Sequence, residues 1–453
     1  MTSFFSDLIG SISDRGRSLV GLPPDGGGRK RDMAKLAETL LSGRGEASGV
    51  ALARELLDQF RRADSEARRD FLLVLARDFG PDAERLEKAI AAWEAEQTAA
   101  AAMELHKASE PRRQELIRRL NLAPGGTAQL VAMREELFKH QGAFPELGAL
   151  DADFTHLFSS WFNRGFLVLR QIDWTTPANI LDKVIQYEAV HAIHDWEDLR
   201  RRIEPEDRRL FAFFHPQLVD EPLIFVEVAL MPEIPGAIAP VLSETRKHIK
   251  QGAATTAVFY SISNCQEGLR GISFGNFLIK QVVEDLKRSL PGLTNFVTLS
   301  PVPGFARWLA KERESLPAAD QHALLPLDEP GWFKDAGVAE DVRRVLLPQA
   351  ARYFLEAKGP SGRPLDPVAR FHLGNGARLE RLNPAGDLSP KGLKEGHGLM
   401  VNYLYDLGDI EKNHEVYAEK GPVAASSAVR GFLPADKRRA GRFPSLTLAG
   451  SRS

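Results

Sequence analysis

The chain has 453 residues, with 59 Lys or Arg against 61 Asp or Glu, so its formal net charge is -2 at pH 7. This length suits two or three globular domains, and 43% hydrophobic residues exclude a disordered or fibrous protein. The single cysteine, Cys265, excludes an intrachain disulfide or a multi-cysteine metal site, and the balanced charge gives no global attraction for nucleic acid.

The two ends of the chain are predicted to lie outside the folded domains. Residues 1–32 contain a Pro- and Gly-rich run, which indicates a flexible leader, and the Arg-, Ser- and Gly-rich residues 435–453 indicate a disordered tail. No basic segment precedes a long apolar stretch, and no apolar run approaches the ~20 residues that span a bilayer. We therefore expect a cytoplasmic protein with no membrane partner.

Residues 33–160 are predicted to form a helical domain. Leu56, Leu57 and Phe60 recur at helical spacing, and charged residues occupy the other faces. Pro81 beside Asp82 is typical of a helix start. No titratable group in this region calls for chemistry. We expect a mainly structural domain that also contacts other subunits.

The pattern changes after Trp161, where strands alternate with helices and indicate an α/β domain over residues 161–434. An amphipathic helix is predicted from Phe274 to Leu290, and a helical insertion from about 308 to 355. The predicted strands are Leu223–Leu230, Thr256–Ser263, Asn295–Ser300, Val368–Leu373 and Leu399–Leu407.

A Gly-punctuated loop joins the strand that ends near Ser263 to the helix that begins near Phe274. Such a loop lets backbone N–H groups approach a phosphate at the positive end of the helix dipole. The loop therefore predicts a pyrophosphate cradle. Glycines at a strand-to-helix turn also serve close packing alone, so the pattern by itself leaves both interpretations open.

The same loop contains Gly271-Ile-Ser273-Phe-Gly275, which fits the G-x-S-x-G pattern of serine hydrolases. A triad could be assembled from Ser273, Asp366 and His372. Against this alternative, about ten residues separate the strand end from Ser273, whereas a nucleophile elbow sits at the turn itself. An oxyanion loop of the HGGG type is also absent from the sequence.

Two further positions are candidates for chemistry. Ser300 begins the turn Ser300-Pro-Val-Pro-Gly304, whose prolines hold the hydroxyl in a fixed place, although a Ser-Pro hydroxyl can also serve its own turn. His372 is predicted to lie in an apolar strand, where a histidine is a catalyst or a satisfied core residue. The metal-binding motif H-E-x-x-H and the nucleotide-binding motifs G-x-x-x-x-G-K-[ST] and G-x-G-x-x-G are absent.

Taken together, five ordered blocks resemble the malonyl-CoA decarboxylase family. The match is strong from about Phe211 to Tyr405 and diffuse in the helical half. The blocks are Phe259-Tyr-Ser-Ile-Ser263, Gln266-x-Gly268-Leu-x-Gly271, Leu299-Ser300-Pro-x-Pro-Gly-Phe305, Asp366-Pro-Val-Ala-x-Phe-His372-Leu-x-Asn375-Gly-Ala377 and Gly398-Leu-Met-x-Asn402-Tyr.

The resemblance implies an α+β chain with an all-helical oligomerisation domain followed by an N-acetyltransferase-like, CoA-binding mixed-sheet domain. It also implies a Ser/His catalytic pair at Ser300 and His372. Animal members carry an acidic residue where this chain has Ser273, so a role for that carboxylate is open here. The positions that match the family's CoA-contacting stretch are Arg270, Gly271, Ile272, Ser273, Phe274, Gly275 and Asn276.

The function implied is decarboxylation of malonyl-CoA to acetyl-CoA and CO2, with no cofactor because the thioester carbonyl accepts the charge. His372 would protonate or polarise the thioester enolate, and Ser300 would orient the carboxylate or relay the proton. The alternatives are an acyl-CoA-dependent N-acyltransferase and a non-catalytic CoA-binding protein. We expect a homo-oligomer and no nucleic-acid partner or bound metal.

Overall fold

A computed structural model describes residues 32–435 except 44, 273–277, 330 and 420. The chain divides into two compact units. The first comprises the residues up to 168 together with 214–223 and 266–274, and the second comprises 169–213, 224–265 and the residues from 275 onward. Nearly all of the predicted leader and tail lies outside the described residues.

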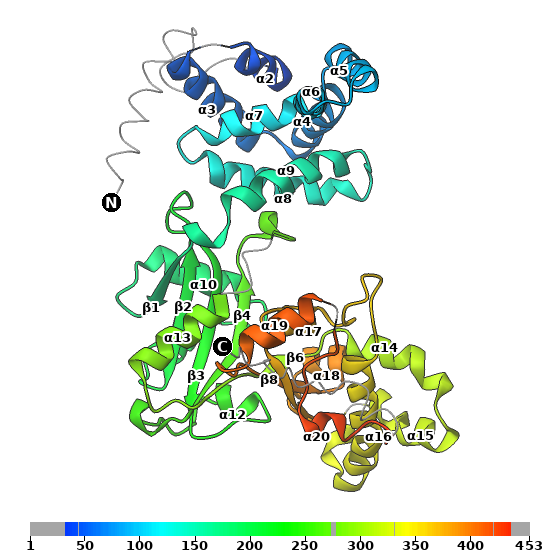
Figure 1. Ribbon diagram of the computed structural model, residues 1–453. Helices are drawn as coiled ribbons and strands as arrows, with labels where there is room; N and C mark the ends of the chain where they lie inside the picture. The colour runs from blue at the N-terminus through cyan, green and yellow to red at the C-terminus, as the bar shows by residue number, and fades with distance from the viewer. Residues whose placement is uncertain (1–31, 44, 273–277, 330, 420, 436–453) are drawn as a thin grey trace, which may run out of the picture. The chain divides into compact units, whose positions relative to one another are not determined.

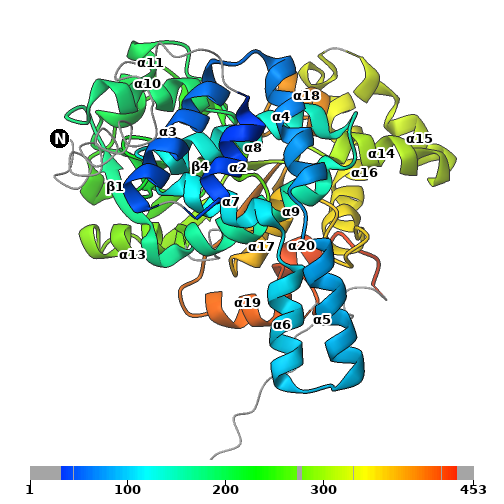
Figure 2. The same cartoon turned by 90° about the horizontal axis from the view of Figure 1, so that it is seen from above.

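The first unit is built from amphipathic helices, as expected. In α3, Leu52, Leu56 and Phe60 are buried on one face, which is the spacing that predicted a helix. Figure 2 shows α5 and α6 as a hairpin extending from the other helices of this unit. The helices are α2 (Met33–Leu41), α3 (Glu46–Arg62), α4 (Ser65–Asp78), α5 (Ala83–Ala95), α6 (Ala99–Ser109), α7 (Arg112–Asn121), α8 (Gly126–Gln141) and α9 (Leu147–Trp161).

The second unit is built on a mixed sheet with the strand order β1-β2-β3-β4-β5-β8-β6, in which β7 also pairs with β8. This confirms a helical domain followed by a mixed-sheet domain. The strands are β1 (Val168–Ile172), β2 (Arg208–Phe214), β3 (Pro222–Met231), β4 (Thr256–Asn264), β5 (Asn295–Thr298), β6 (Ser300–Pro301), β7 (Arg378–Asn383) and β8 (Met400–Leu404).

The central strands β4 and β5 run parallel and then separate. Their register ends at the pair Phe259 and Thr298. Beyond that point β4 continues beside β3, whereas Ser300 pairs with Val401 of β8. Because the chain stays paired with β8 beyond β5 but no longer pairs with β4, the sheet opens between Tyr260 and Ser300. This opening positions the site described below.

Helices cover both faces of the sheet. Figure 2 shows α10 and α11 on one face and α13 on the other. The apolar face of α13 is buried through Val282, Val283 and Leu286, as its pattern predicted. The helices are α10 (Ala178–Tyr187), α11 (Trp196–Ile203), α12 (Ala239–Leu242), α13 (Leu278–Ser289), α14 (Phe305–Glu312), α15 (Ala318–Ala323), α16 (Ala336–Leu355), α17 (Pro367–Gly374), α18 (Pro390–Gly396), α19 (Ile410–Ala418) and α20 (Ser427–Arg430).

The predicted helical insertion is confirmed by α14, α15 and α16, which Figure 1 shows in yellow-green beside α18. The predicted strand Val368–Leu373 is wrong, because these residues lie in helix α17. The single strand expected over Asn295–Ser300 is divided between β5 and β6, and β1, β2 and β7 were not predicted. Within the described residues, no helix combines the length and the apolarity that crossing a bilayer requires.

Candidate active site

Ser300 lies where β5 gives way to β6, and its side chain is 5% exposed. Its hydroxyl donates to Thr298 Oγ1 over 2.8 Å. Thr298 is itself fixed, because its Oγ1 accepts from the backbone N–H of Tyr403 over 3.1 Å and its carbonyl accepts from Asn402 Nδ2 over 2.8 Å. The Ser300 hydroxyl is therefore held by two neighbouring strands as well as by the Ser-Pro turn.

His372 reaches the same place from helix α17. The helix begins after Asp366, whose carboxylate accepts from the backbone N–H of Ala369 over 2.8 Å, and Pro367 occupies the first turn. These start signals outweigh the apolar alternation that predicted a strand. His372 is 3% exposed, and its ring stacks on Tyr403 with the centroids 4.6 Å apart.

The hydrogen bonds of His372 assign its tautomer. Its Nε2 lies 3.2 Å from Ser300 Oγ, and its Nδ1 lies 2.8 Å from the hydroxyl of Tyr405. Because the Ser300 hydroxyl donates its hydrogen bond to Thr298, Ser300 Oγ accepts a hydrogen bond from His372 Nε2–H. The Tyr405 hydroxyl then donates to Nδ1. This chain of bonds places the imidazole proton on Nε2, facing Ser300.

The charge state of His372 follows from its surroundings. Burial alone lowers the pKa of His372 to about 3, so the ring is neutral near pH 7. Burial likewise raises the pKa of Tyr405 and of Tyr403, and both hydroxyls stay protonated. Ser300, His372, Tyr403 and Tyr405 are thus uncharged, and no counterion faces His372 among the described residues.

A cavity of about 250 Å³ opens beside Ser300 and His372, where β4 and β5 separate. None of the described residues that line it is Lys, Arg, Asp or Glu. Its walls are Val190, Phe259, Tyr260, Ile262, Asn264, Leu299, Ser300, Pro301, Pro367, Val368, Phe371 and His372. The cavity therefore offers an acyl group a largely apolar space with two neutral donors at one end.

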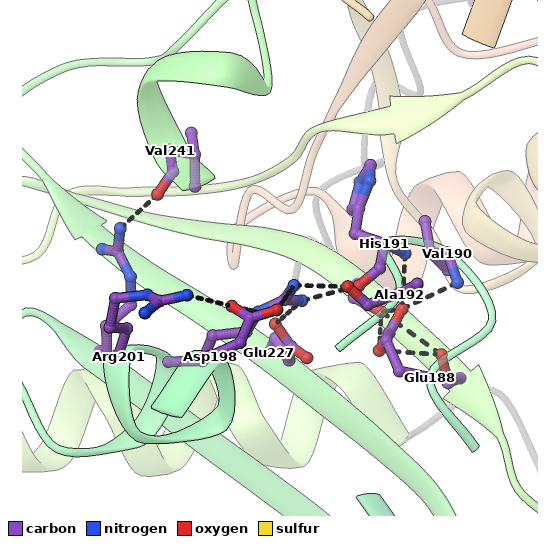
Figure 3. Close-up of polar contacts among 12 residues, drawn as sticks. Glu188, Val190, His191, Ala192, Asp198, Arg201, Glu227 and Val241 are labelled. Carbon is purple, nitrogen blue, oxygen red and sulfur yellow. Dashed lines mark hydrogen bonds and ion pairs between the residues drawn. The ribbon is translucent and has the colours of Figure 1, made fainter. Parts of the chain in front are cut away.

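A second polar cluster, here called the ionic cluster, consists of the buried Glu188, Arg202 and Glu227 and the half-buried Asp198. Figure 3 labels Glu188, Asp198 and Glu227. Arg202 contacts Glu227 over 3.3 Å and Asp198 over 3.2 Å. Burial raises the pKa of Glu227 to about 8, and the nearby Glu188 adds to that rise. Burial opposes the charge of Arg202, but Glu227, Tyr260 and Asp198 outweigh it and raise its pKa. Asp198 supplies the anionic partner when Glu227 carries a proton.

The Glu188 carboxylate accepts hydrogen bonds from four donors outside the ionic cluster. It accepts from the backbone N–H groups of Val190 and His191, each over 2.8 Å, and from the hydroxyls of Ser261 and Ser263. Both Glu188 carboxylate oxygens therefore already accept hydrogen bonds from groups of this chain. The Glu188 carboxylate therefore holds the loop after α10 in place, whereas Oε1 of Glu227 has no hydrogen-bond partner among the described residues.

Comparison with known proteins gives the family. Residues 165–442 match the malonyl-CoA decarboxylase C-terminal domain, and residues 79–162 match the malonyl-CoA decarboxylase N-terminal domain. The chain belongs to the malonyl-CoA decarboxylase family. The resemblance inferred from the sequence blocks is confirmed.

Relatives and solved structures agree with this family. The mitochondrial malonyl-CoA decarboxylase of Anser anser anser is 33% identical over 417 residues, which cover 84% of this chain and 82% of that protein. The crystal structure of the malonyl-CoA decarboxylase from Rhodopseudomonas palustris is 63% identical with a TM-score of 0.86, covering 88% of this chain and 98% of the other. The corresponding structure from Agrobacterium vitis is 61% identical with a TM-score of 0.85, covering 89% and 99%.

The loop that matches the family's CoA-contacting stretch is only partly described. Ser273, Phe274, Gly275 and Asn276 lie outside the described residues. Arg270, Gly271 and Ile272 belong to the first compact unit, whereas Ser300 and His372 belong to the second. The structure therefore brings Ser300 and His372 together and leaves the rest of the predicted site a prediction.

Within the first unit, this loop is fixed on helix α8. Arg134 donates to the carbonyls of Gly268 and Arg270, each over 2.9 Å. A Cβ at Gly268 would lie 2.0 Å from the carbonyl of Val131, so this glycine is required by close packing. Gly271 has a φ of +81° and is required by the turn. The Arg270 guanidinium pairs with Glu267 and lies 4.2 Å from the centroid of the Phe138 ring.

The hydrolase triad considered from the sequence receives no support among the described residues. Asp366 caps α17 and accepts from the hydroxyl of Tyr353 over 3.2 Å, while Nδ1 of His372 faces Tyr405. Burial raises the pKa of Asp366. In the described part of the chain, no group of three or more His, Cys, Asp or Glu residues could hold a metal ion.

Sequence reasoning missed the residues that support the pair. Tyr403 and Tyr405 are two apart at the end of β8, and this spacing places both rings on one face of a strand. That spacing was the available signal. For the ionic cluster, the signal was Glu227 within the apolar run of β3, because a buried carboxyl needs a partner. Its partner Arg202 could not be identified from the sequence.

Proposed function

We propose that this chain decarboxylates malonyl-CoA to acetyl-CoA and CO2, with Ser300 and His372 as the groups that act on the acyl part. The family supports the substrate, because its relatives are named for this activity. One observation supports the chemistry: the cavity beside the pair has neutral donors and no charged lining residue among those described.

The reaction breaks the bond between the carboxylate carbon and the α-carbon. The bonding electrons move onto the thioester, where negative charge develops on the carbonyl oxygen as an enolate. A neutral His372 with its proton on Nε2 suits hydrogen-bond donation to that oxygen, and donors aimed at developing charge are a large catalytic term. The α-carbon then takes up a proton relayed by the Ser300–His372 pair, so each turnover consumes one proton from solvent.

The apolar walls of the cavity beside Ser300 and His372 also favour loss of CO2. A malonyl carboxylate in this cavity loses hydration without meeting a described cationic side chain. The transition state spreads that charge toward the thioester oxygen, which can replace Ser300 Oγ as the acceptor of His372 Nε2–H. The carboxylate is therefore destabilised more than the enolate, and loss of CO2 is favoured.

The remaining assignments follow from the sequence pattern and the family. The residues from Arg270 to Asn276 bind the CoA pyrophosphate, with Arg270 exchanging Glu267 for a phosphate oxygen. No cofactor is required. The chain is a cytoplasmic homo-oligomer assembled through its helical domain. A crosslinking and light-scattering measurement on residues 1–453 with and without CoA tests the assembly.

The deciding experiment is incubation of the purified protein with malonyl-CoA in D2O. Equal amounts of CO2 and acetyl-CoA are expected, with deuterium in the methyl group of acetyl-CoA. A parallel reaction contains an amine acceptor. An N-acyl product in place of acetyl-CoA would identify an acyltransferase, and tight CoA binding without product would identify a binding protein. Either result would contradict the proposal.

A further inference from the structure

Two cavities of the sheet domain meet at Val190 and Pro301. The larger, of about 250 Å³, contains Ser300 and His372 in its walls, and the smaller has a volume of about 130 Å³. Val190 and Pro301 are the described residues that line both cavities. They therefore form the wall between the two. The smaller cavity far exceeds the ~15 Å³ that one water needs, so it is real space beyond this wall.

The backbone at Val190 is held firmly in this position. Its N–H donates to Glu188 over 2.8 Å, and Arg202 donates to the carbonyls of His191 and Ala192 over 2.8 and 2.9 Å. Figure 3 shows Glu188 facing the backbone of Val190 and His191. On the preceding residue, the carbonyl of Ala189 accepts from Lys391 Nζ over 2.8 Å. The loop cannot move aside without breaking bonds to buried charges.

Of the two wall residues, Val190 is the one that can set the size of the acyl group independently of the reactive pair. Pro301 follows Ser300 directly, and its ring fixes the turn that holds the hydroxyl. Val190 lies in a different segment and makes its backbone bonds to the ionic cluster. Its side chain can therefore be shortened or lengthened without altering the Ser300 turn.

We propose that Val190 is a specificity-determining residue, which limits this site to the unbranched malonyl group and excludes malonyl thioesters that carry an alkyl group on the α-carbon. This inference rests on the proposed decarboxylation. Because the ionic cluster immobilises Val190, the wall does not yield to a larger acyl group. Removing its two methyl groups joins the smaller cavity to the larger and provides the missing space.

The test compares V190A and V190L with the unchanged protein. The readout is the ratio of kcat/KM for methylmalonyl-CoA to that for malonyl-CoA. A displacement of Ser300 that changes kcat/KM by the same factor for both substrates leaves this ratio unchanged. V190A is expected to raise the ratio about 10-fold or more, which is the scale on which a hydrophobic pocket discriminates one methylene. V190L is expected to lower it. If V190A is unstable, V190L alone decides.

The matched control is V302A, because Val302 lines only the smaller cavity and loses the same two methyl groups. It enlarges the space without opening the wall, so its ratio should remain within about twofold of the unchanged protein. An unmoved ratio in V190A and V190L, or an equal rise in V302A, overturns the assignment of Val190. Absence of malonyl-CoA decarboxylation in the unchanged protein overturns the proposed function itself.

Discussion

Two polar clusters of the sheet domain differ in their charge. The Ser300–His372 cluster is neutral, since burial lowers the pKa of His372 to about 3 and no ion pair among the described residues offsets this shift. The ionic cluster keeps Arg202 charged by surrounding it with Asp198 and Glu227. Groups whose charge is already compensated hold a structure in place. Neutral donors without a counterion remain available for charge that arises only during a reaction.

The largest expected effect is on turnover, when the neutral cluster is altered. H372Q and S300A should each lower kcat for malonyl-CoA by about 10²- to 10⁴-fold, because each removes a donor to the enolate or a step of proton transfer. Steady-state assays of CO2 release measure this. KM should change much less than kcat, since the CoA part is proposed to bind at residues 270–276.

The control for H372Q is H215Q, because His215 is also buried, at 7% exposure, and lies in the first compact unit. H215Q should retain turnover per folded molecule. If H372Q kept near-normal kcat with an intact fold, the assignment of His372 would be wrong, and so would the contrast between a reactive and a structural cluster.

The next effect is on stability, when the ionic cluster is altered. R202M leaves the buried Glu227 and the half-buried Asp198 without their cation, and breaking a buried ion pair in this way costs about 3–5 kcal/mol. Urea unfolding measures it. R201M is the matched neighbour, because Arg201 is 35% exposed and its pairs with Asp198 and Glu244 should contribute about 0–1 kcal/mol. Equal losses of unfolding free energy in R202M and R201M would show that the ionic cluster stabilises the fold no more than an exposed ion pair does.

Glu227 gives the cluster a predictable dependence on pH. Its pKa in the folded protein is about 8, above the ordinary 4.5, so its contribution to stability is fully present below pH 4.5 and is lost as the pH rises toward 8. Gln cannot ionise and lacks this loss. The free energy of unfolding of the unchanged protein minus that of E227Q should therefore fall by ~1–3 kcal/mol between pH 5 and pH 8. A constant difference, or a rise, would show that Glu227 is ionised throughout.

Sequence reasoning predicted Ser300 and His372 as a pair but not the residues that surround them. Ser300 and His372 were found because short motifs carry them, and the structure places them 3.2 Å apart. His372 was nonetheless predicted in a strand. The local signals conflict there: the apolar alternation of residues 368–373 favours a strand, whereas the Asp366-Pro367 start favours the helix that forms.

The rest depends on contacts between distant segments. The Thr298 and Tyr405 hydroxyls matter only because β8 lies against β5 and β6. Likewise, the wall at Val190 exists because Glu188 meets Ser261, 73 positions along the chain. Periodicity and spacing describe one segment at a time, so they predict helix faces and strand ends well. They do not reveal which buried acid meets which buried base.

The smallest expected effect is on kcat in Y405F, and it distinguishes the Tyr405 hydroxyl, which positions His372, from the Tyr403 ring, which only packs on it. Y405F removes the donor to His372 Nδ1 and leaves the ring, so the proton is no longer confined to Nε2. One neutral hydrogen bond contributes about 0.5–1.5 kcal/mol, which corresponds to a loss of up to about 10-fold in kcat.

Y403F is the matched control. Tyr403 stacks on His372, and its hydroxyl makes no hydrogen bond within the described part of the chain, so Phe keeps the contact that matters. Its kcat should stay near that of the unchanged protein. ¹⁵N NMR of the His372 ring, assigned by its absence in H372Q, reports the tautomer directly. The Nε2–H form should dominate in the unchanged protein and in Y403F and decline in Y405F. If kcat fell in Y405F while the tautomer stayed fixed, the Tyr405 hydroxyl would not act by placing the proton, and the neutral cluster would owe its proton placement to Thr298 and Ser300 alone.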